Sequence, residues 1–237
     1  MWNNYGYYEY KPKKTKSELA TQIEKLRKKN PNIQPVIIEG KIANTWWAQA
    51  WNKNLESYAD YSNRIGRGRS YVKGGYVIDL SIAPGKVQAL VQGTRAKPYE
   101  ITVEIDPLAP KKWDSIVKRC SHKIENLEKL ASGSFPQEFI ELFTNKGEGL
   151  FPSPKEIHFS CSCPDWAYMC KHVAAVLYGI GARFDNDPTL FFLLREIDFS
   201  ELLKKSVDEK MKNMLKNAGN ITERVMNDVN TYELFGV

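Results

Sequence analysis

Four metal-binding side chains fall within twelve residues of this 237-residue chain, in the segment CSCPDWAYMCKH. Cys161, Cys163, Cys170 and His172 follow the order C-x-C-x6-C-x-H. Zinc takes a tetrahedron of thiolate sulfur and imidazole nitrogen, and this set supplies all four ligands. The segment therefore predicts one structural Zn²⁺, and the chain around it must fold so that the two pairs of ligands meet.

The local sequence offers a way to bring the two pairs together. EIHFSCSC is typical of a strand, in which alternate side chains share a face, so Cys161 and Cys163 point the same way. Pro164 and Asp165 then turn the chain. KHVAAVLYGIGARF is typical of a helix, and its positive N-terminus favours the net negative charge of a zinc ion that carries three thiolates.

Other uses of these residues fit the pattern less well. Disulfides between such near neighbours would constrain little chain entropy. A catalytic zinc normally keeps a position for water, whereas four sulfur-rich ligands close the site. A chance cluster of buried cysteines around a core histidine remains the alternative. Cys120 and His122 form a smaller C-x-H pair, but they face apart on a helix; His158 is either an outer-shell partner or an ordinary strand histidine.

Hydrophobic periodicity predicts an α+β fold: an antiparallel β meander with flanking helices, a small zinc finger of β-hairpin and helix, and a helical C-terminal tail. Strands are expected at 70–72, 76–82, 86–92 and 99–105, with Gly74–Gly75 and Pro84–Gly85 as turns. Helices are expected at 17–30, 45–58, 112–131, 137–144, 171–184, after Pro188 and from 199 onward; those at 112–131 and 137–144 are expected to cover one sheet face.

The predicted helix over TWWAQAWNKNLESYA buries Trp47, Ala50, Trp51, Leu55 and Tyr58 and leaves Trp46 off that stripe. Composition changes along the chain suggest four parts. We expect a basic, partly mobile leader over 1–40, an α+β domain with the sheet over 41–150, the zinc finger and its following helix over 151–197, and a helical extension over 198–237.

Charge is divided unevenly along the chain. Residues 1–130 carry 23 basic and 13 acidic side chains, a net +10, whereas residues 131–237 carry 11 and 15, a net −4. The basic half is suited to phosphate. Arg64, Arg67 and Arg69 share the predicted loop RIGRGRSY, which either contacts phosphates or is a solvated turn. Arg95 and Lys97 extend this basic surface, and Lys171 lies between two metal ligands.

Several enzyme classes lack their motifs in this chain. It has no G-x-x-x-x-G-K-[ST], no G-x-S-x-G and no H-E-x-x-H, so a P-loop ATPase is excluded and we expect neither catalysis nor a small-molecule substrate. Asp185 and Asp187 are expected to cap helices or lie in loops. With no apolar stretch of roughly 18 residues and no secretory signal, the sequence predicts a cytoplasmic protein without a membrane segment.

The metal-binding segment resembles the SWIM zinc finger, C-x-C-x(n)-C-x-H followed by an amphipathic helix. The resemblance to bacterial and archaeal SWIM zinc finger proteins covers roughly two thirds of the chain, from TWW at 45 through the LFPSP segment to FFLLR. Tyr168 and Met169 stand where the family has Asn-Pro, which leaves the ligands in place. The resemblance implies a zinc module that binds DNA or protein, often in association with Snf-family helicase-like ATPases; related fingers occur in Mutator-like transposases.

Two functions follow as hypotheses. The first is a non-catalytic accessory protein that binds nucleic acid, DNA in particular, through the residues Arg64, Arg67, Arg69, Arg95, Lys97 and Lys171. The alternative is an adaptor for a Snf-family ATPase. It is favoured by the acidic finger half and by the dense apolar run that begins with Phe191 and Phe192, which we expect to be partly exposed.

Overall fold

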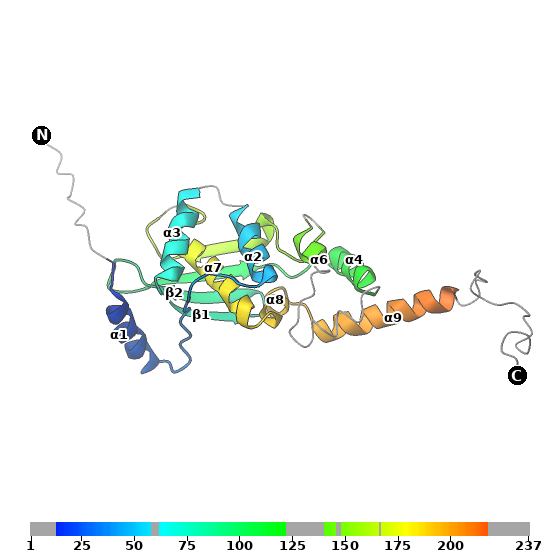
Figure 1. Ribbon diagram of the computed structural model, residues 1–237, viewed down its shortest axis with the longest axis horizontal. Coiled ribbons are helices and arrows are strands. Elements are labelled where there is room, and N and C mark those ends of the chain that lie inside the picture. The colour runs from blue at the N-terminus through cyan, green and yellow to red at the C-terminus, as the bar shows by residue number, and fades with distance from the viewer. Residues whose placement is uncertain (1–12, 58–61, 122–139, 146–147, 166, 218–237) are drawn as a thin grey trace, which may run out of the picture.

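The computed structural model describes residues 13–57, 62–121, 140–145, 148–165 and 167–217, and it confirms the α+β architecture (Figure 1). The strands are β1 (Val77–Ala83), β2 (Lys86–Val91), β3 (Tyr99–Ile105) and β4 (Ile157–Cys161). The helices are α1 (Lys16–Arg27), α2 (Trp46–Glu56), α3 (Ser62–Lys73), α4 (Pro110–Ser121), α6 (Ile140–Thr144), α7 (Lys171–Asn186), α8 (Thr189–Leu194) and α9 (Phe199–Asn217), with a 3-10 turn, η2, at Pro154–Glu156.

The strands form one antiparallel sheet in the order β1-β2-β3-β4. The first three agree with the predicted strands to within one residue at each end. A tight turn at Gly85, whose φ is +64°, joins β1 to β2. Strand β4 pairs with β3 so that Cys161 lies opposite Ile101. The metal-binding segment therefore begins on a strand of the main sheet.

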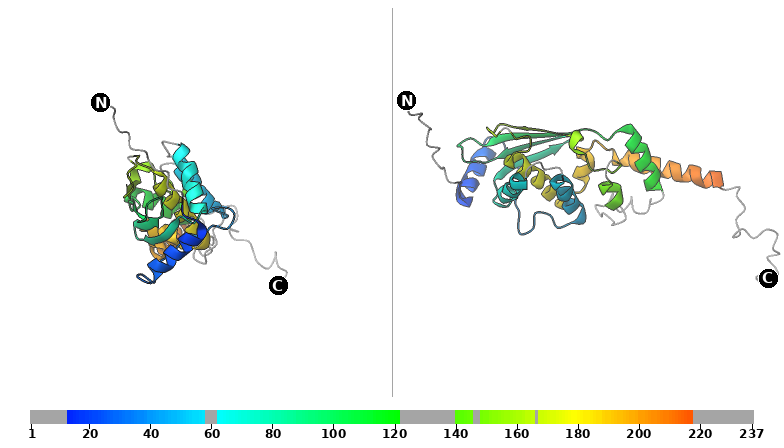
Figure 2. Two further views of the ribbon diagram at one scale, coloured as in Figure 1. Left: turned by 90° about the vertical axis from the view of Figure 1, so that its left-hand side faces the viewer. Right: turned by 90° about the horizontal axis from the view of Figure 1, so that it is seen from above.

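Helix α7 covers one face of the sheet, with α2 and α3 beside it, so the fold has two layers (Figure 2). Every residue from His172 to Ala182 is buried. Strand β3 buries alternate residues from Tyr99 to Ile105 against this layer. The other face of the sheet exposes polar side chains such as Gln88 and Glu104. The core therefore lies between α7 and the sheet.

Residues 62–73 form helix α3, so the predictions of an Arg/Gly loop and of a strand at 70–72 are wrong. Ile65, Gly68, Tyr71 and Val72 are buried, at the spacing of one helix face. Gly66 and Gly68 hide this period in the sequence, because glycine is unfavourable in helices and typical of loops and turns. Only the fold shows that the face packs against α7.

Two glycines have defined roles at this helix. Gly68 lies so close to α7 that a Cβ atom there would approach the Cβ of Ala174 to 2.5 Å. Gly75, with a φ of +74°, ends the turn that leads from α3 into β1. Gly74 and Gly75 therefore join a helix to a strand, and the predicted hairpin turn at this position is wrong.

Part of the predicted leader packs along the outer edge of β1. The Val36 N–H donates to the Val77 carbonyl and the Leu80 N–H donates to the Gln34 carbonyl, each at 3.0 Å. Ile33 and Val36 are both buried. This edge of the sheet is therefore covered by the chain that precedes it, which protects its backbone groups from pairing with another molecule.

Helix α2 buries much of its expected face. Trp51 and Leu55 are buried as predicted, while Trp47 is half-buried and donates its Nε1–H to the Phe184 carbonyl at 2.9 Å. Tyr58 lies outside the described residues. Trp46 is also half-buried, with its ring edge-on to that of Trp47 at 5.8 Å. It is therefore a packing residue and not a free surface for stacking.

Phe191 and Phe192 are core residues, only 3% and 4% exposed, so the prediction that they present a partner surface is wrong. The Phe191 ring lies 5.0 Å from that of Phe143 in α6 and 6.5 Å from that of Trp51 in α2. Helix α8 has neighbours on several sides, and Leu193 alone of its phenylalanine and leucine run reaches 39% exposure. The apolar run in α8 is too dense for one buried helix face because this helix is buried on more than one side.

Helices α4 and α9 pack together at one end of the molecule (Figure 1). Helix α4 is the described part of the helix predicted at 112–131. Helix α6 is the described part of the helix predicted at 137–144. Residues 122–139 lie outside the described ranges. These two helices were expected to cover one face of the sheet, but the helix that packs against all four strands is α7. Among the helices described, none has the length and apolarity needed to cross a membrane.

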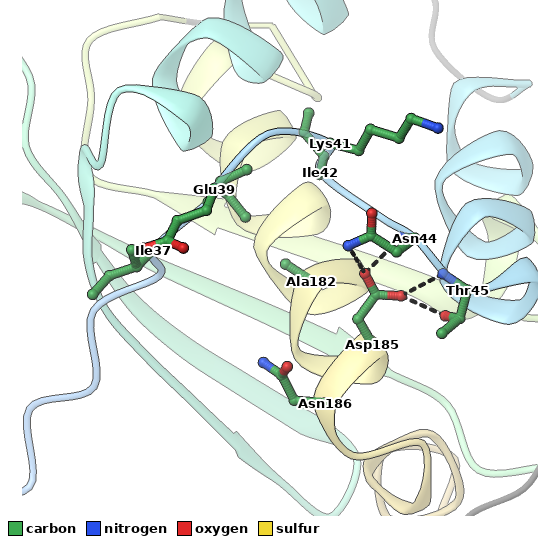
Figure 3. A pocket seen from close by; sticks show the side chains of 10 residues that line it. Ile37, Glu39, Lys41, Ile42, Asn44, Thr45, Ala182, Asp185 and Asn186 are labelled. Carbon is green, nitrogen blue, oxygen red and sulfur yellow. Dashed lines mark hydrogen bonds between the residues drawn. The ribbon is translucent and has the colours of Figure 1, made fainter.

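Asp185 and Asp187 cap helices, as predicted. The Asp185 carboxylate accepts hydrogen bonds from the backbone N–H groups of Asn44 (2.6 Å) and Thr45 (2.9 Å) and from the Thr45 hydroxyl at the start of α2 (Figure 3). Asp187 accepts from the Thr189 N–H at 2.9 Å, at the start of α8. A surface cleft of about 440 Å³ lies beside Asp185. The carboxylate at its border is thus engaged in hydrogen bonds to the start of α2.

A buried ion pair joins the end of α8 to the turn before β4. The Arg195 side chain is fully buried, and it donates to Glu156 at 2.9 Å and to the Asp106 carbonyl at 2.7 Å. Burial alone would raise the pKa of Glu156. Hydrogen bonds from the Ser153 N–H and hydroxyl and from Arg195 outweigh burial and lower the pKa to about 2.

Gly68→Ala is expected to reduce the free energy of unfolding by about 1–3 kcal/mol, because the new methyl group forces α3 away from α7. Gly66 lies in the same helix with open space around it, so Gly66→Ala should raise the free energy of unfolding by up to about 1 kcal/mol. Urea unfolding of both variants measures the difference. Equal effects of the two substitutions would contradict the packing of α3 on α7.

Glu156→Gln is expected to lower the free energy of unfolding at pH 7 by roughly 3 kcal/mol. Since the folded-state pKa lies below the ordinary value of 4.5, this contribution is present above about pH 4.5 and is lost as the pH falls through about 2. Urea unfolding at several pH values should show that the variant loses this pH dependence. Asp208→Asn, at an exposed position of α9, is the control and should keep it.

Candidate metal centre

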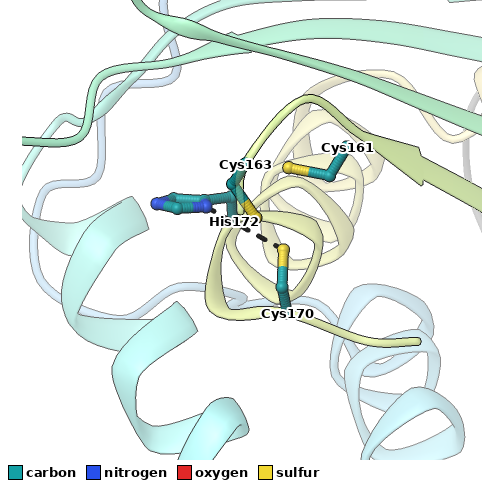
Figure 4. Close-up of side chains that lie close together, drawn as sticks. All are labelled: Cys161, Cys163, Cys170 and His172. Atoms are coloured by element: carbon teal, nitrogen blue, oxygen red, sulfur yellow. Dashed lines mark hydrogen bonds between the residues drawn. The ribbon is translucent and has the colours of Figure 1, made fainter. Parts of the chain in front are cut away.

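The four predicted ligands come from the end of β4, the chain just after it and the first turn of α7. Cys161 ends β4, Cys170 is the N-cap of α7 and His172 is the second residue of that helix. With Cys163, they bring three sulfur atoms and one ring nitrogen within 4.8 Å of one another (Figure 4). The two pairs of ligands therefore meet, although eight residues lie between Cys161 and Cys170.

The start of α7 favours negative charge on the cluster. The Cys170 Sγ atom accepts a hydrogen bond from the Val173 N–H at 3.5 Å and lies 3.9 Å from His172 Nδ1. A hydrogen bond from the Cys161 thiol lowers the pKa of Cys170 well below its ordinary value, and the contacts with His172 and Val173 add to this effect. The same bond raises the pKa of Cys161. One sulfur is thus prepared as a thiolate, and a bound dication stabilises the negative charge on all three.

The donor set fits zinc. Zinc–sulfur and zinc–nitrogen bonds of about 2.3 and 2.1 Å place neighbouring ligand atoms roughly 3.7 Å apart, so the present cluster needs only a small contraction. Thiolates and imidazole are ligands that zinc prefers, whereas calcium and magnesium require oxygen. With all four positions of the tetrahedron filled by the protein, the bound ion has a structural role.

Two tyrosine rings flank the histidine ligand. The ring centres of Tyr99 and Tyr71 lie 4.5 and 5.3 Å from that of His172. Burial raises the pKa of both tyrosines. Cations gather around the same rings: Lys13 Nζ lies 4.4 Å and Lys171 Nζ 6.0 Å from the centre of Tyr71, and the Arg95 guanidinium 5.8 Å from that of Tyr99. The metal cluster is therefore bordered by aromatic rings and positive charge.

A surface cleft of about 700 Å³ opens beside the cluster. Its lining consists of Lys14, Thr94, Arg95, Ala96, Tyr99, Cys163, Pro164, Asp165, Lys171 and His172. Two residues predicted to bind nucleic acid, Arg95 and Lys171, thus meet in one cleft. Sequence reasoning missed Lys13 and Lys14, whose only signal is the basic run KPKKTK in the leader.

Gln92 holds one wall of this cleft in place. Its side chain is fully buried, and its Nε2 donates to the carbonyls of Gly93 (2.8 Å) and Arg95 (2.6 Å) in the segment between β2 and β3. Its Oε1 accepts from Gln22 of α1 at 2.6 Å. The backbone that carries Arg95 is therefore fixed to both the sheet and α1.

The other predicted basic residues do not gather in the cleft. Three form ion pairs within the chain: Arg64 with Asp165 (2.6 Å), Arg69 with Glu56 (2.5 Å) and Lys97 with Glu100 (3.0 Å). Arg67 is exposed on α3. Because a helix directs successive residues around its axis, the three arginines of α3 do not form one compact group.

The remaining histidine and cysteine candidates lie apart from the cluster. His158 Nε2 pairs with Asp106 at 3.1 Å on the exposed face of the sheet, which makes it an ordinary strand histidine and not an outer-shell partner. Cys120 is buried in α4 and does not belong to the group of four ligands. His122 lies outside the described residues.

The purified chain is expected to contain close to one zinc equivalent. Cys163→Ser and Cys170→Ser should each lose the metal and unfold the region 155–197, because structural zinc contributes folding free energy on the order of 10 kcal/mol. Cys120→Ala is the matched control and should keep the metal. Metal analysis together with circular dichroism measures both effects, and zinc retained by the two serine variants would contradict the ligand assignment.

Comparison with known proteins agrees with this geometry. The SWIM zinc finger family model matches residues 157–179. The uncharacterized protein Rv2102 of Mycobacterium tuberculosis is 38% identical to the chain over 165 residues, which make up 69% of this chain and 59% of Rv2102. The chain thus spans less than two thirds of that relative, and no solved structure matches it significantly. It carries a SWIM zinc finger with one zinc site and is a homologue of Rv2102.

Proposed function

We propose that this zinc-binding protein is a non-catalytic accessory protein that binds nucleic acid, DNA in particular, through the basic cleft beside the zinc site. The observation that carries the proposal is the meeting of Lys14, Arg95 and Lys171 in one cleft, although they lie far apart in the sequence. Since thiolate ligands persist in a reducing compartment, the cytoplasm is the proposed location.

The balance of charge supports an anionic ligand. Three thiolates and a neutral imidazole leave a zinc site with one net negative charge. Four cations surround it: Lys13 and Lys14 from the segment before α1, Arg95 from the segment between β2 and β3, and Lys171 from α7. Asp165 also lines the cleft, but Arg64 neutralises it at 2.6 Å. The surroundings of the site thus retain an excess of positive charge.

The shape of the surface supports a chain-like ligand. A second hollow, about 510 Å³ in volume, runs beside α1 and shares Lys14 and Ala96 with the cleft. Lys25 of α1 also lines it. The two hollows adjoin at these shared residues, and lysine or arginine lines both. Glu18, which also lines the second hollow, accepts a hydrogen bond from the Thr15 N–H at the start of α1. A nucleic-acid strand, with one phosphate per nucleotide, matches two adjoining hollows better than a compact anion does.

The alternative function, an adaptor for a Snf-family ATPase, has less support. Phe191 and Phe192, which suggested an exposed apolar surface, are buried in the core. A partner of that kind remains compatible with nucleic-acid binding, because an accessory protein can contact both. We therefore place nucleic-acid binding first.

Affinity for a single-stranded oligonucleotide is expected to fall with salt, with a log–log slope of about −0.7 for each phosphate neutralised. The double substitution Arg95→Ala and Lys171→Ala removes two such contacts and should reduce the magnitude of the slope by about 1.4. Fluorescence anisotropy at several salt concentrations measures this change. Zinc content and melting temperature show whether the variant is folded.

The control carries the same loss of charge elsewhere. Lys204→Ala and Lys212→Ala are exposed positions of α9, at the end of the molecule opposite α1 (Figure 1). This double variant should keep the slope of the unchanged protein. If the two double variants have equal slopes, the cleft is not the binding site; if the unchanged protein binds no oligonucleotide, the proposed function is wrong.

A further inference from the structure

One nitrogen of the histidine ligand has no hydrogen-bond partner within the part of the chain that the structure describes. His172 is 2% exposed, and its Nε2 atom is fully buried. Nδ1 faces the cysteine sulfurs, whereas Nε2 points away from them (Figure 4). A neutral imidazole that binds zinc through Nδ1 carries its proton on Nε2. Histidine ligands almost always donate this proton to an oxygen atom, so His172 needs an acceptor.

The position of His172 shows where that acceptor would come from. The residue lines the same cleft as Lys14, Arg95 and Lys171. Gly93, at the end of β2, lies close to the ring: a Cβ atom there would lie 3.5 Å from Nε2 and would overlap the ring of Tyr99, so only a residue without a side chain fits here. A buried donor, a bare backbone and several cations thus meet at one place.

We propose that this place is a phosphate subsite, in which one oxygen accepts the His172 Nε2–H and the others pair with Arg95 and Lys171. The inference rests on the proposed function, since the phosphate would belong to the bound nucleic-acid backbone. A phosphate group suits the site because it has several acceptor oxygens and a negative charge. The lysine and arginine supply charge, and the histidine supplies a donor whose direction the zinc ion fixes.

The zinc site and ligand binding are linked in this arrangement. Zinc at Nδ1 orients the ring and keeps the proton on Nε2, so the metal prepares the donor without touching the phosphate. The competing acceptor is a water molecule held by the ring and the backbone near Gly93. A water that stays in place when phosphate is added would leave the histidine signal unchanged, and this separates the two acceptors.

The test uses the zinc-loaded full chain with ¹⁵N-labelled histidine, and inorganic phosphate as the probe. Long-range ¹H–¹⁵N spectra report the ring nitrogens of all three histidines, and zinc-bound Nδ1 identifies His172. We expect a saturable shift of the His172 Nε2 signal with phosphate, and none with sodium chloride at equal ionic strength. His158, on the exposed face of the sheet, provides an internal reference.

Two double variants test the cations. Arg95→Gln with Lys171→Gln should keep zinc and raise the apparent Kd for phosphate about tenfold or more, because charge-assisted hydrogen bonds are lost. Lys204→Gln with Lys212→Gln removes the same charge from α9 and should change the Kd by less than about twofold. His172→Cys keeps a zinc ligand but removes the Nε2–H, and with zinc retained it should also weaken phosphate binding.

The outcomes separate the subsite from the proposed function. If oligonucleotides bind with the expected salt dependence while His172 Nε2 does not respond to phosphate, the subsite is overturned and the proposed function stands. If phosphate shifts His172 Nε2 saturably but no oligonucleotide binds, the subsite is supported and the proposed function is wrong. Equal phosphate affinities in the two double variants would also overturn the subsite.

Discussion

Three sulfur atoms and one imidazole meet where strand β4 and the first turn of α7 come together. The rest of the structure is arranged around this connection between the strand and the helix. Strand β4 belongs to the sheet through its pairing with β3, while α7 forms the buried layer against that sheet. A metal ion bound to both elements fixes the start of α7, and thus of the helical layer, relative to strand β4 of the sheet. The free energy of structural zinc binding, on the order of 10 kcal/mol, is as large as the whole stability of a typical domain.

Close helix packing continues the same arrangement. Gly68 lets α3 approach α7 at Ala174, and this approach sets Tyr71, one turn later, against the ring of His172. On the other side, Tyr99 reaches the same ring from β3. The histidine is thus held by elements of both layers. Its orientation, and with it the direction of Nε2, depends on packing as well as on the metal.

Local patterns in the sequence predict a large part of this fold. Strand alternation places β1 to β3, and the cysteine and histidine spacing identifies the zinc ligands, because each pattern reflects a geometry that a few neighbouring residues determine. Helix α3 and the burial of Phe191 are not predictable in this way. Gly66 and Gly68 conceal the helical period of α3, and the neighbours that bury α8 come from distant helices.

The basic cleft is likewise not predictable from local sequence patterns. Arg64 and Arg69 are close in sequence, yet neither lines the cleft: Arg64 pairs with Asp165 at its border, and Arg69 pairs with Glu56. Lys14, Arg95 and Lys171 are far apart in sequence and meet only because the segment before α1, the segment after β2 and the start of α7 end at the same corner of the fold. Charge counts identify a basic half of the chain, but only tertiary contacts bring these cations together.

The most direct measurement of the central claim is X-ray absorption at the zinc edge of the purified chain. A closed site made of Cys161, Cys163, Cys170 and His172 predicts three sulfur neighbours at about 2.3 Å and one nitrogen neighbour at about 2.1 Å. No oxygen neighbour is expected, and the spectrum should be the same with and without bound oligonucleotide. A site with fewer than three sulfurs, or with a water or phosphate oxygen bound to zinc, would contradict the account.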